Sequence, residues 1–140
     1  MQKLPNEILD EIYKYTDKET CVRDKQYHML KYFSDATIDW AAKNGYLDLV
    51  KYLRSKGEKC TGFTMEYAAR NGHLEVVKYM YSKDETYKTD AMCWAADNGH
   101  LEIVKYLHSK GEKCCSNTMY WAIKNGHTDV VEYLKLIEMK

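Results

Sequence analysis

The sequence predicts an all-α solenoid, in which an N-terminal capping helical segment is followed by four short helix pairs packed side by side. The first observation is that the pair Asn-Gly recurs at 44–45, 71–72, 98–99 and 125–126, a period of 27 residues each time. The second is that the surrounding segments share one pattern, as in WAAKNGYLDLVKYLRSKG and WAADNGHLEIVKYLHSKG. A period of about 20–50 residues is typical of solenoids, in which each unit buries its apolar face against its neighbours.

The first helix of each unit is predicted from a small apolar stripe that ends at the Asn-Gly pair. In the second unit, Met65, Ala68 and Ala69 have the i, i+3, i+4 spacing of one helical face. Gly72 then ends the helix, because glycine adopts the left-handed conformation without a steric penalty. Asn-Gly can also mark a β-hairpin turn. The helical periodicity of the flanking residues excludes that reading.

The second helix of the same unit is predicted from Leu74 to about Lys83. Val76, Val77 and Met80 fall on the side that faces the core. The polar connectors between units, such as SKGEKCTGFT, are too short for a further helix. Each unit is therefore expected to contain two helices and a tight turn.

Composition and charge exclude several classes of function. The 140 residues carry 21 basic and 21 acidic side chains, so no overall field favours nucleic acid or an anionic membrane. No run approaches the roughly 18 apolar residues of a membrane-spanning helix. The N-terminus, MQKLPNEILDEIYKYT, lacks the features of a secretory signal.

The cysteines favour a reducing compartment. There are five of them, without a CxxC pair: Cys21, Cys60, Cys93, Cys114 and Cys115. An odd number without metal-ligand spacing is typical of reduced thiols. We therefore expect the protein to be located in the cytoplasm (the host cytoplasm for a viral protein), with the nucleus as the alternative. We also expect it to be a monomer.

The repeated string AAxNGHLEVVKYL followed by SKG resembles the ankyrin repeat, whose core reads AAxxGHxxVVxLLLxxGA. The resemblance covers residues 34–140, as repeats at about 34–60, 61–87, 88–114 and 115–140. The period is shorter than the family's usual length of about 33 residues. The missing residues lie between Gly57 and the pair Ala68-Ala69, where ankyrins carry a β-hairpin finger. Short-period arrays of this kind look similar to those of giant viruses, and the resemblance implies a scaffold that binds a protein target.

The segment 1–33 differs from the repeats. Its start, LPNEILDEIYKYT, resembles an F-box, whose opening reads LPxEILxxIxxYL, over about half of that motif's length. This resemblance implies docking to the Skp-type adaptor of a cullin-type ubiquitin ligase, through Leu4, Pro5, Ile8, Leu9 and Ile12. The alternative is that the same apolar stripe only caps the open face of the first repeat. Residues 27–33 already resemble a degenerate second ankyrin helix.

One face of the first helices is the candidate binding surface. The same position holds an aromatic ring in every unit: Trp40, Tyr67, Trp94 and Trp121. At about 100° per residue this position lies opposite the core stripe, so the rings should line the inner, concave side. Three residues later the charge varies: Lys43, Arg70, Asp97 and Lys124. The rings either stack on one another or anchor a partner, and the charges are either solvated or form the variable part of a recognition strip.

No residue pattern predicts catalysis, a cofactor or a metal. His73, His100 and His127 occupy equivalent places on successive units. Stacked helices lie about 8–10 Å apart, whereas zinc needs nitrogen ligands at about 2.0–2.1 Å. We expect these histidines to bond backbone groups between the two helices. The sequence therefore predicts a non-catalytic interaction module, with a structural repeat protein lacking a ligase link as the alternative.

Overall fold

The computed structural model describes residues 17–32, 36–83 and 89–138, and in these ranges the chain forms helices and no strands. The helices are α2 (Lys18–Arg23), the 3-10 helix η1 (Tyr27–Tyr32), α3 (Ile38–Lys43), α4 (Leu47–Ser55), α5 (Gly62–Arg70), α6 (Leu74–Tyr81), α7 (Ala91–Asp97), α8 (Leu101–Ser109), α9 (Thr118–Lys124) and α10 (Thr128–Glu138). The predicted all-α fold is confirmed. Helix α6 ends at Tyr81, two residues before the expected Lys83.

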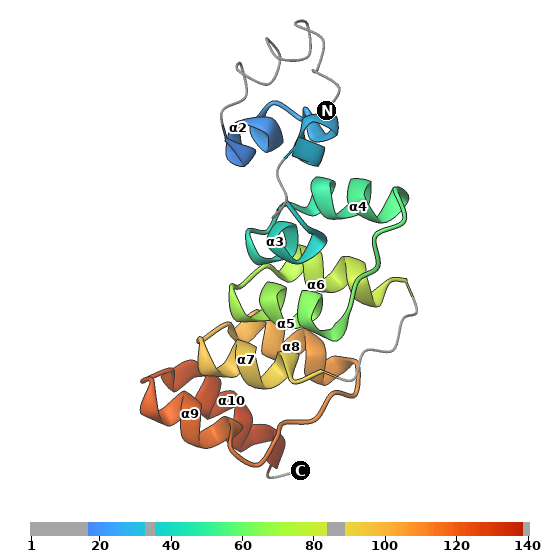
Figure 1. The fold of residues 1–140 in the computed structure, drawn as a ribbon. Coiled ribbons are helices and arrows are strands. Elements are labelled where there is room, and N and C mark those ends of the chain that lie inside the picture. The colour runs from blue at the N-terminus through green and yellow to red at the C-terminus, as the bar shows by residue number, and fades with distance from the viewer. Residues whose placement is uncertain (1–16, 33–35, 84–88, 139–140) are drawn as a thin grey trace, which may run out of the picture.

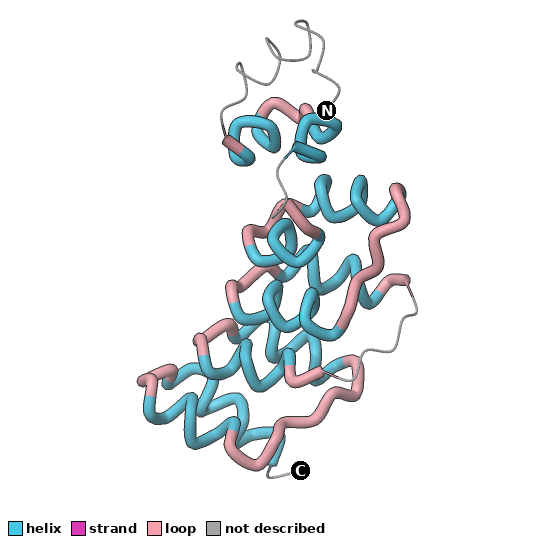
Figure 2. The backbone as a smooth tube through the Cα atoms, viewed as in Figure 1, coloured by secondary structure: helices cyan, strands magenta, loops and turns pink. Residues whose placement is uncertain are grey.

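The helices form two layers that run along an elongated stack (Figure 1). The first helices α3, α5, α7 and α9 pack against one another in sequence, and the second helices α4, α6, α8 and α10 lie in the other layer. Loops join the helices at both edges of the stack (Figure 2). Within the described ranges, no helix is both long and apolar enough to cross a membrane.

The core lies between the two layers and is built from the predicted stripes. Ala68 and Ala69 are fully buried, as are Met65 and Val77. Burial of a Met or Val side chain contributes about 1.5–3 kcal/mol, and the small alanines let the helices approach closely. In the last unit Met119 is only partly buried, because no described helix pair follows it.

Each Asn-Gly pair ends a first helix as predicted. Gly72 has a φ of 83°, in the left-handed region. The N–H of His73 then bonds to the carbonyl of Ala68 at 2.9 Å. The side chain of Asn71 donates to the carbonyl of Tyr67 at 2.8 Å. These bonds satisfy carbonyls that a helix end would otherwise leave without partners.

A histidine follows three of these turns, at Gly72, Gly99 and Gly126, and joins its unit to the one before it. His73 Nε2 lies 2.8 Å from the carbonyl of Lys43 in the preceding unit. His100 and His127 make the same bond to the carbonyls of Arg70 and Asp97, at 2.9 and 3.0 Å. A carbonyl can only accept, so Nε2 carries the proton. We expected the histidines to bond backbone groups between two helices of one unit; the acceptors instead lie on the preceding unit.

The same imidazoles rest against the preceding glycine turns. A Cβ atom added to Gly99 would meet His127 Nδ1 at 2.5 Å, whereas one added to Gly126 would meet nothing within 4 Å. Glycine at position 99 is therefore required twice, once for its φ of 77° and once for the contact. We use the term histidine–glycine lock for the bond from a histidine to the preceding unit together with its contact to that unit's glycine, as formed by His73 with Gly45, His100 with Gly72 and His127 with Gly99.

Residues 17–32 form a further, degenerate helix pair ahead of the four repeats. The N–H of Gln26 bonds to the carbonyl of Cys21 at 2.8 Å, the same bond that closes the later turns. Lys25 takes the place of the glycine, with a φ of 57°. The pair packs on the first repeat through the rings of Tyr27 and Tyr52, whose centroids are 5.4 Å apart. Leu4, Pro5, Ile8, Leu9 and Ile12 lie outside the described residues.

Replacing Gly99 by alanine should destabilise the array more than replacing Gly126. Both glycines have nearly the same φ, 77° and 76°, so backbone strain costs both variants about 1–2 kcal/mol. Only Gly99→Ala also displaces an imidazole, which should cost about 1–3 kcal/mol more. Urea unfolding followed by circular dichroism measures the difference, and equal losses would contradict the lock.

Replacing Lys25 by glycine should stabilise the protein. The change removes the left-handed strain on a residue with a Cβ, worth about 1 kcal/mol after the greater unfolded-state entropy of glycine is counted. Lys25→Ala is the matched control, because it loses the exposed 3.8 Å ion pair with Asp48 but keeps the strain. A melting temperature no higher for Lys25→Gly than for Lys25→Ala would contradict this account.

Candidate functional site

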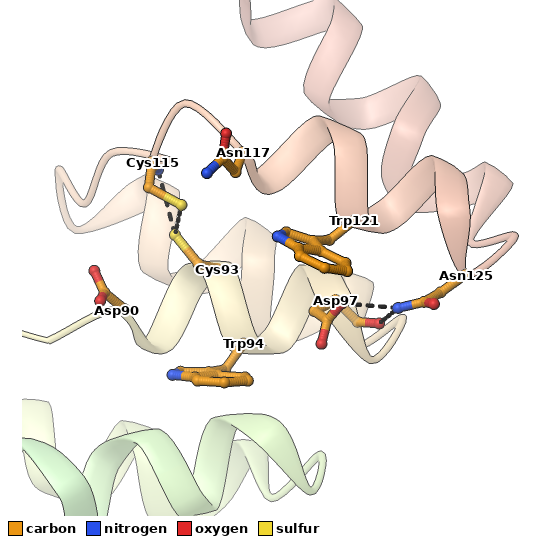
Figure 3. A pocket seen from close by; sticks show the side chains of 8 residues that line it. All are labelled: Asp90, Cys93, Trp94, Asp97, Cys115, Asn117, Trp121 and Asn125. Atoms are coloured by element: carbon orange, nitrogen blue, oxygen red, sulfur yellow. Dashed lines mark hydrogen bonds between the residues drawn. The ribbon is translucent and has the colours of Figure 1, made fainter.

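A pocket of about 440 Å³ lies between α7 and α9, on the face of the first helices (Figure 3). It is lined by Asp90, Cys93, Trp94, Asp97, Cys115, Asn117, Trp121 and Asn125. Its position follows from the repeat, because residues one period apart lie on neighbouring first helices. The pocket thus joins the third and fourth units.

The predicted binding residues lie on the surface of the first-helix layer, and three of them meet at this pocket. Trp94 and Asp97 come from α7 and Trp121 from α9. The two indoles keep 36% and 42% of their surface exposed, which is high for tryptophan. The other predicted residues lie outside the pocket: Trp40 is partly buried, and Lys43, Tyr67, Arg70 and Lys124 are exposed.

The tryptophans at the repeated aromatic position are in contact with cations and do not stack on one another. Lys18 Nζ is 4.5 Å from the centroid of the Trp40 ring, and the Arg70 guanidinium is 4.9 Å from that of Trp94. Lys124 Nζ is 4.8 Å from Trp121. Between the described residues, the ring contacts do not join these aromatics to one another. Exposed cation–π contacts are worth about 0.5–1 kcal/mol each, so the charges at positions 70 and 124 are not simply solvated.

Asp97 breaks this pattern and makes the pocket acidic. The equivalent positions in the other units are basic. The side chain of Asn125 turns toward the carboxylate, and its Nδ2 donates to Asp97 Oδ1 at 2.7 Å and to the Asp97 carbonyl at 3.0 Å. In the second unit the corresponding Asn71 caps its own helix. A negative charge is therefore held at the pocket, between the cations of Arg70 and Lys124.

A side-chain hydrogen bond joins each unit to the next, and its acceptor differs from one junction to another. The junction between the third and fourth units forms part of the pocket wall. At the first junction Thr64 Oγ1 donates to Asp39 Oδ1 at 2.5 Å. At the second, Thr89 Oγ1 donates to Glu66 Oε1 at 3.1 Å. At the third junction the acceptor is the sulfur of a cysteine.

That sulfur belongs to Cys93, and a second thiol lies beside it. Cys93 Sγ lies 2.8 Å from Cys115 Sγ, and Thr118 Oγ1 is 3.1 Å from each sulfur. Burial, followed by the hydrogen bond to Cys115, raises the pKa of Cys93 to about 11. The pKa of Cys115 is lowered. Burial acts to raise it, but hydrogen bonds from Cys93, Thr118 and the Asn117 N–H stabilise the thiolate and outweigh that effect. Cys115, which is exposed, is the thiol that ionises first.

These groups suit binding of a side chain from a partner. Two indole surfaces provide apolar contact, and a carboxylate provides charge. Among the described residues, no group of three or more His, Cys, Asp or Glu side chains is placed to hold a metal ion.

The sequence did not predict five of the lining residues: Asp90, Cys93, Cys115, Asn117 and Asn125. The acid at position 97, where the other units are basic, was a visible signal of a change in this unit. The contact between Cys93 and Cys115 had no such signal, because their separation of 22 residues does not match the period.

The sequence profile described as ankyrin repeats (3 copies) matches residues 19–90, 38–118 and 65–139. The chain belongs to the ankyrin-repeat family. Ankyrin repeats are in general modules for protein–protein interaction, and the family is typically non-catalytic. The first match begins within α2, in agreement with the degenerate pair ahead of the first repeat. A comparison with curated proteins finds no match.

The thiols of this ankyrin array should differ sharply in reactivity. Iodoacetamide attacks the thiolate, so at pH 8 Cys115 should be alkylated at least about tenfold faster than Cys93, which ionises only near pH 11. Cys21 is fully buried, with a pKa raised first by burial, and is the slow reference. Peptide mass spectrometry over time measures each rate. Equal rates at Cys93 and Cys115 would contradict this arrangement.

Proposed function

We propose that the protein is a non-catalytic scaffold that binds a protein target with the face of its first helices, centred on the pocket between α7 and α9. The observation that supports this most is the pair of half-exposed tryptophans, Trp94 and Trp121, which line one pocket together with the acidic Asp97. Tryptophan is enriched at binding hot spots because it supplies a large contact area with little loss of conformational entropy.

The charges beside the pocket define the kind of segment that would fit. Arg70, Asp97 and Lys124 stand on successive first helices, which lie about 8–10 Å apart. A complementary segment carries a basic side chain that enters the pocket toward Asp97. Acidic side chains on both sides of it would meet Arg70 and Lys124. Such charge matching favours the correct partner over others more than it adds affinity.

The proposal is tested by the loss of one specific partner. We expect Asp97→Asn and Trp121→Ala each to reduce binding of a protein captured from the native cell at least about tenfold, as truncation of a hot-spot residue does. Asp97→Asn keeps the side-chain shape and removes the charge. Quantitative affinity purification with mass spectrometry compares the variants with wild type.

The matched control alters the opposite layer. Glu102 and Lys105 form an exposed 3.1 Å ion pair on α8, so the double alanine variant should keep full binding. Circular dichroism confirms that each variant is folded. If both pocket variants kept every partner of the wild type, the face of the first helices would not be the binding surface.

The role as substrate adaptor of a cullin-type ubiquitin ligase is a separate proposal. It is supported by the resemblance of LPNEIL at 4–9 to the opening of an F-box. For a giant-virus protein, which the short period suggests, the target would be a host protein. A pull-down of the full chain with purified Skp-type adaptor tests the idea, with Leu4→Asp and Ile8→Asp as variants. Absence of binding by the wild-type chain would remove it.

A structural role without a partner is the second candidate. The cations that lie over Trp40, Trp94 and Trp121 favour it, because these contacts already cover part of each ring. A structural protein would lose stability when one of these tryptophans is replaced, whereas an interaction module would lose affinity for its partner. Measuring both for Trp121→Ala separates the two functions.

A further inference from the structure

The two thiols at the junction between the third and fourth repeats are placed for chemistry that partner binding does not use. We propose that Cys93 and Cys115 form a reversible disulfide by exchange with a low-molecular-weight disulfide such as glutathione disulfide. The proposal does not depend on the partner or on the ligase role. It makes this junction a site of thiol modification.

The geometry brings the two sulfurs together from separate elements. Cys93 lies on α7, and Cys115 lies in the connector that precedes α9 (Figure 3). Their sulfurs are 2.8 Å apart, against about 2.05 Å in a disulfide. The Cys115 N–H also donates to Cys93 Sγ at 3.3 Å, which holds the connector against the helix. Only a small movement separates the contact from a covalent bond.

The pairing is specific to one of two adjacent cysteines. Cys114 points elsewhere, with its sulfur 3.8 Å from Met92 Sδ in the core. Cys115 faces Cys93 and is exposed, whereas Cys93 is partly buried. Among the three junctions between the repeats, this is the one with a thiol at that position, because the first and second junctions have a carboxylate where the third has Cys93.

The exchange proceeds in two displacements. Cys115 is exposed and has the lowered pKa, so its thiolate attacks one sulfur of glutathione disulfide. The glutathione S–S bond breaks, a mixed disulfide forms on Cys115, and one glutathione thiolate leaves. Cys93 then loses its proton and attacks Cys115 Sγ, which expels the second glutathione. In sum two protein thiols lose two electrons and two protons, and glutathione disulfide becomes two glutathione molecules.

The bond would tie the last repeat to the rest of the stack. It spans 22 residues of sequence and encloses α8. A cross-link that closes such a loop stabilises the folded state, chiefly by restricting the unfolded chain. Both cysteines also line the pocket, so the bond would fix one of its walls.

The test incubates the full chain with glutathione disulfide, blocks free thiols with iodoacetamide, and examines tryptic peptides by mass spectrometry. We expect a cross-link between peptides 89–105 and 114–124, with the bond at Cys115 in the fragment spectra. Dithiothreitol should reverse it. The melting temperature should rise by about 5 °C or more on oxidation.

The adjacent cysteine provides the matched control. Cys114→Ser should keep both the cross-link and the rise in melting temperature, whereas Cys115→Ser should lose both. The wild-type measurement needs no variant to fold. Two results would overturn the proposal: wild-type protein that gains only glutathione adducts or stays reduced, or a cross-link that persists in Cys115→Ser and disappears in Cys114→Ser.

Discussion

The stack depends on the contact between an imidazole and the glycine turn of the unit before it. His73, His100 and His127 each bond a carbonyl at the end of the preceding first helix and fill the space that a Cβ would take. A hydrogen bond of this kind is worth only about 0.5–1.5 kcal/mol net. Because its partners are backbone groups in a fixed turn, it sets the spacing and rotation of the second, third and fourth units relative to the unit before each. The alanine and valine core can then close at the same register each time.

Once the locks fix the register, the side chains beside them are free to vary. The first two junctions bring a carboxylate to a threonine hydroxyl, and the third brings one cysteine to another. On the neighbouring face, Arg70 covers an indole whereas Asp97 takes a hydrogen bond from Asn125. Because both departures from the repeated pattern lie between α7 and α9, we place the binding site there rather than evenly along the stack.

Sequence reasoning predicts the core stripes and the glycine turns, which recur with the period. Met65, Ala68 and Gly72 belong to patterns seen four times, so their burial and turn geometry follow from spacing alone. The period also places Trp94 and Trp121 at one repeated position of the first helices, opposite the core stripe. The turn of Asn125 toward Asp97, and the meeting of Cys93 with Cys115, each occur once. Both depend on side-chain directions at one junction, which no periodic pattern encodes.

The degenerate pair at residues 17–32 gives the stack two unlike ends. At its junction with the first repeat, Tyr46 stands where later units have histidine and packs on Trp40, at 5.4 Å between ring centroids. Lys25 stands where they have glycine. Because stability in such arrays is a sum over neighbouring units, this weaker joint is where the array would first come apart. The degenerate pair would then separate from the first repeat while the four repeats remain assembled.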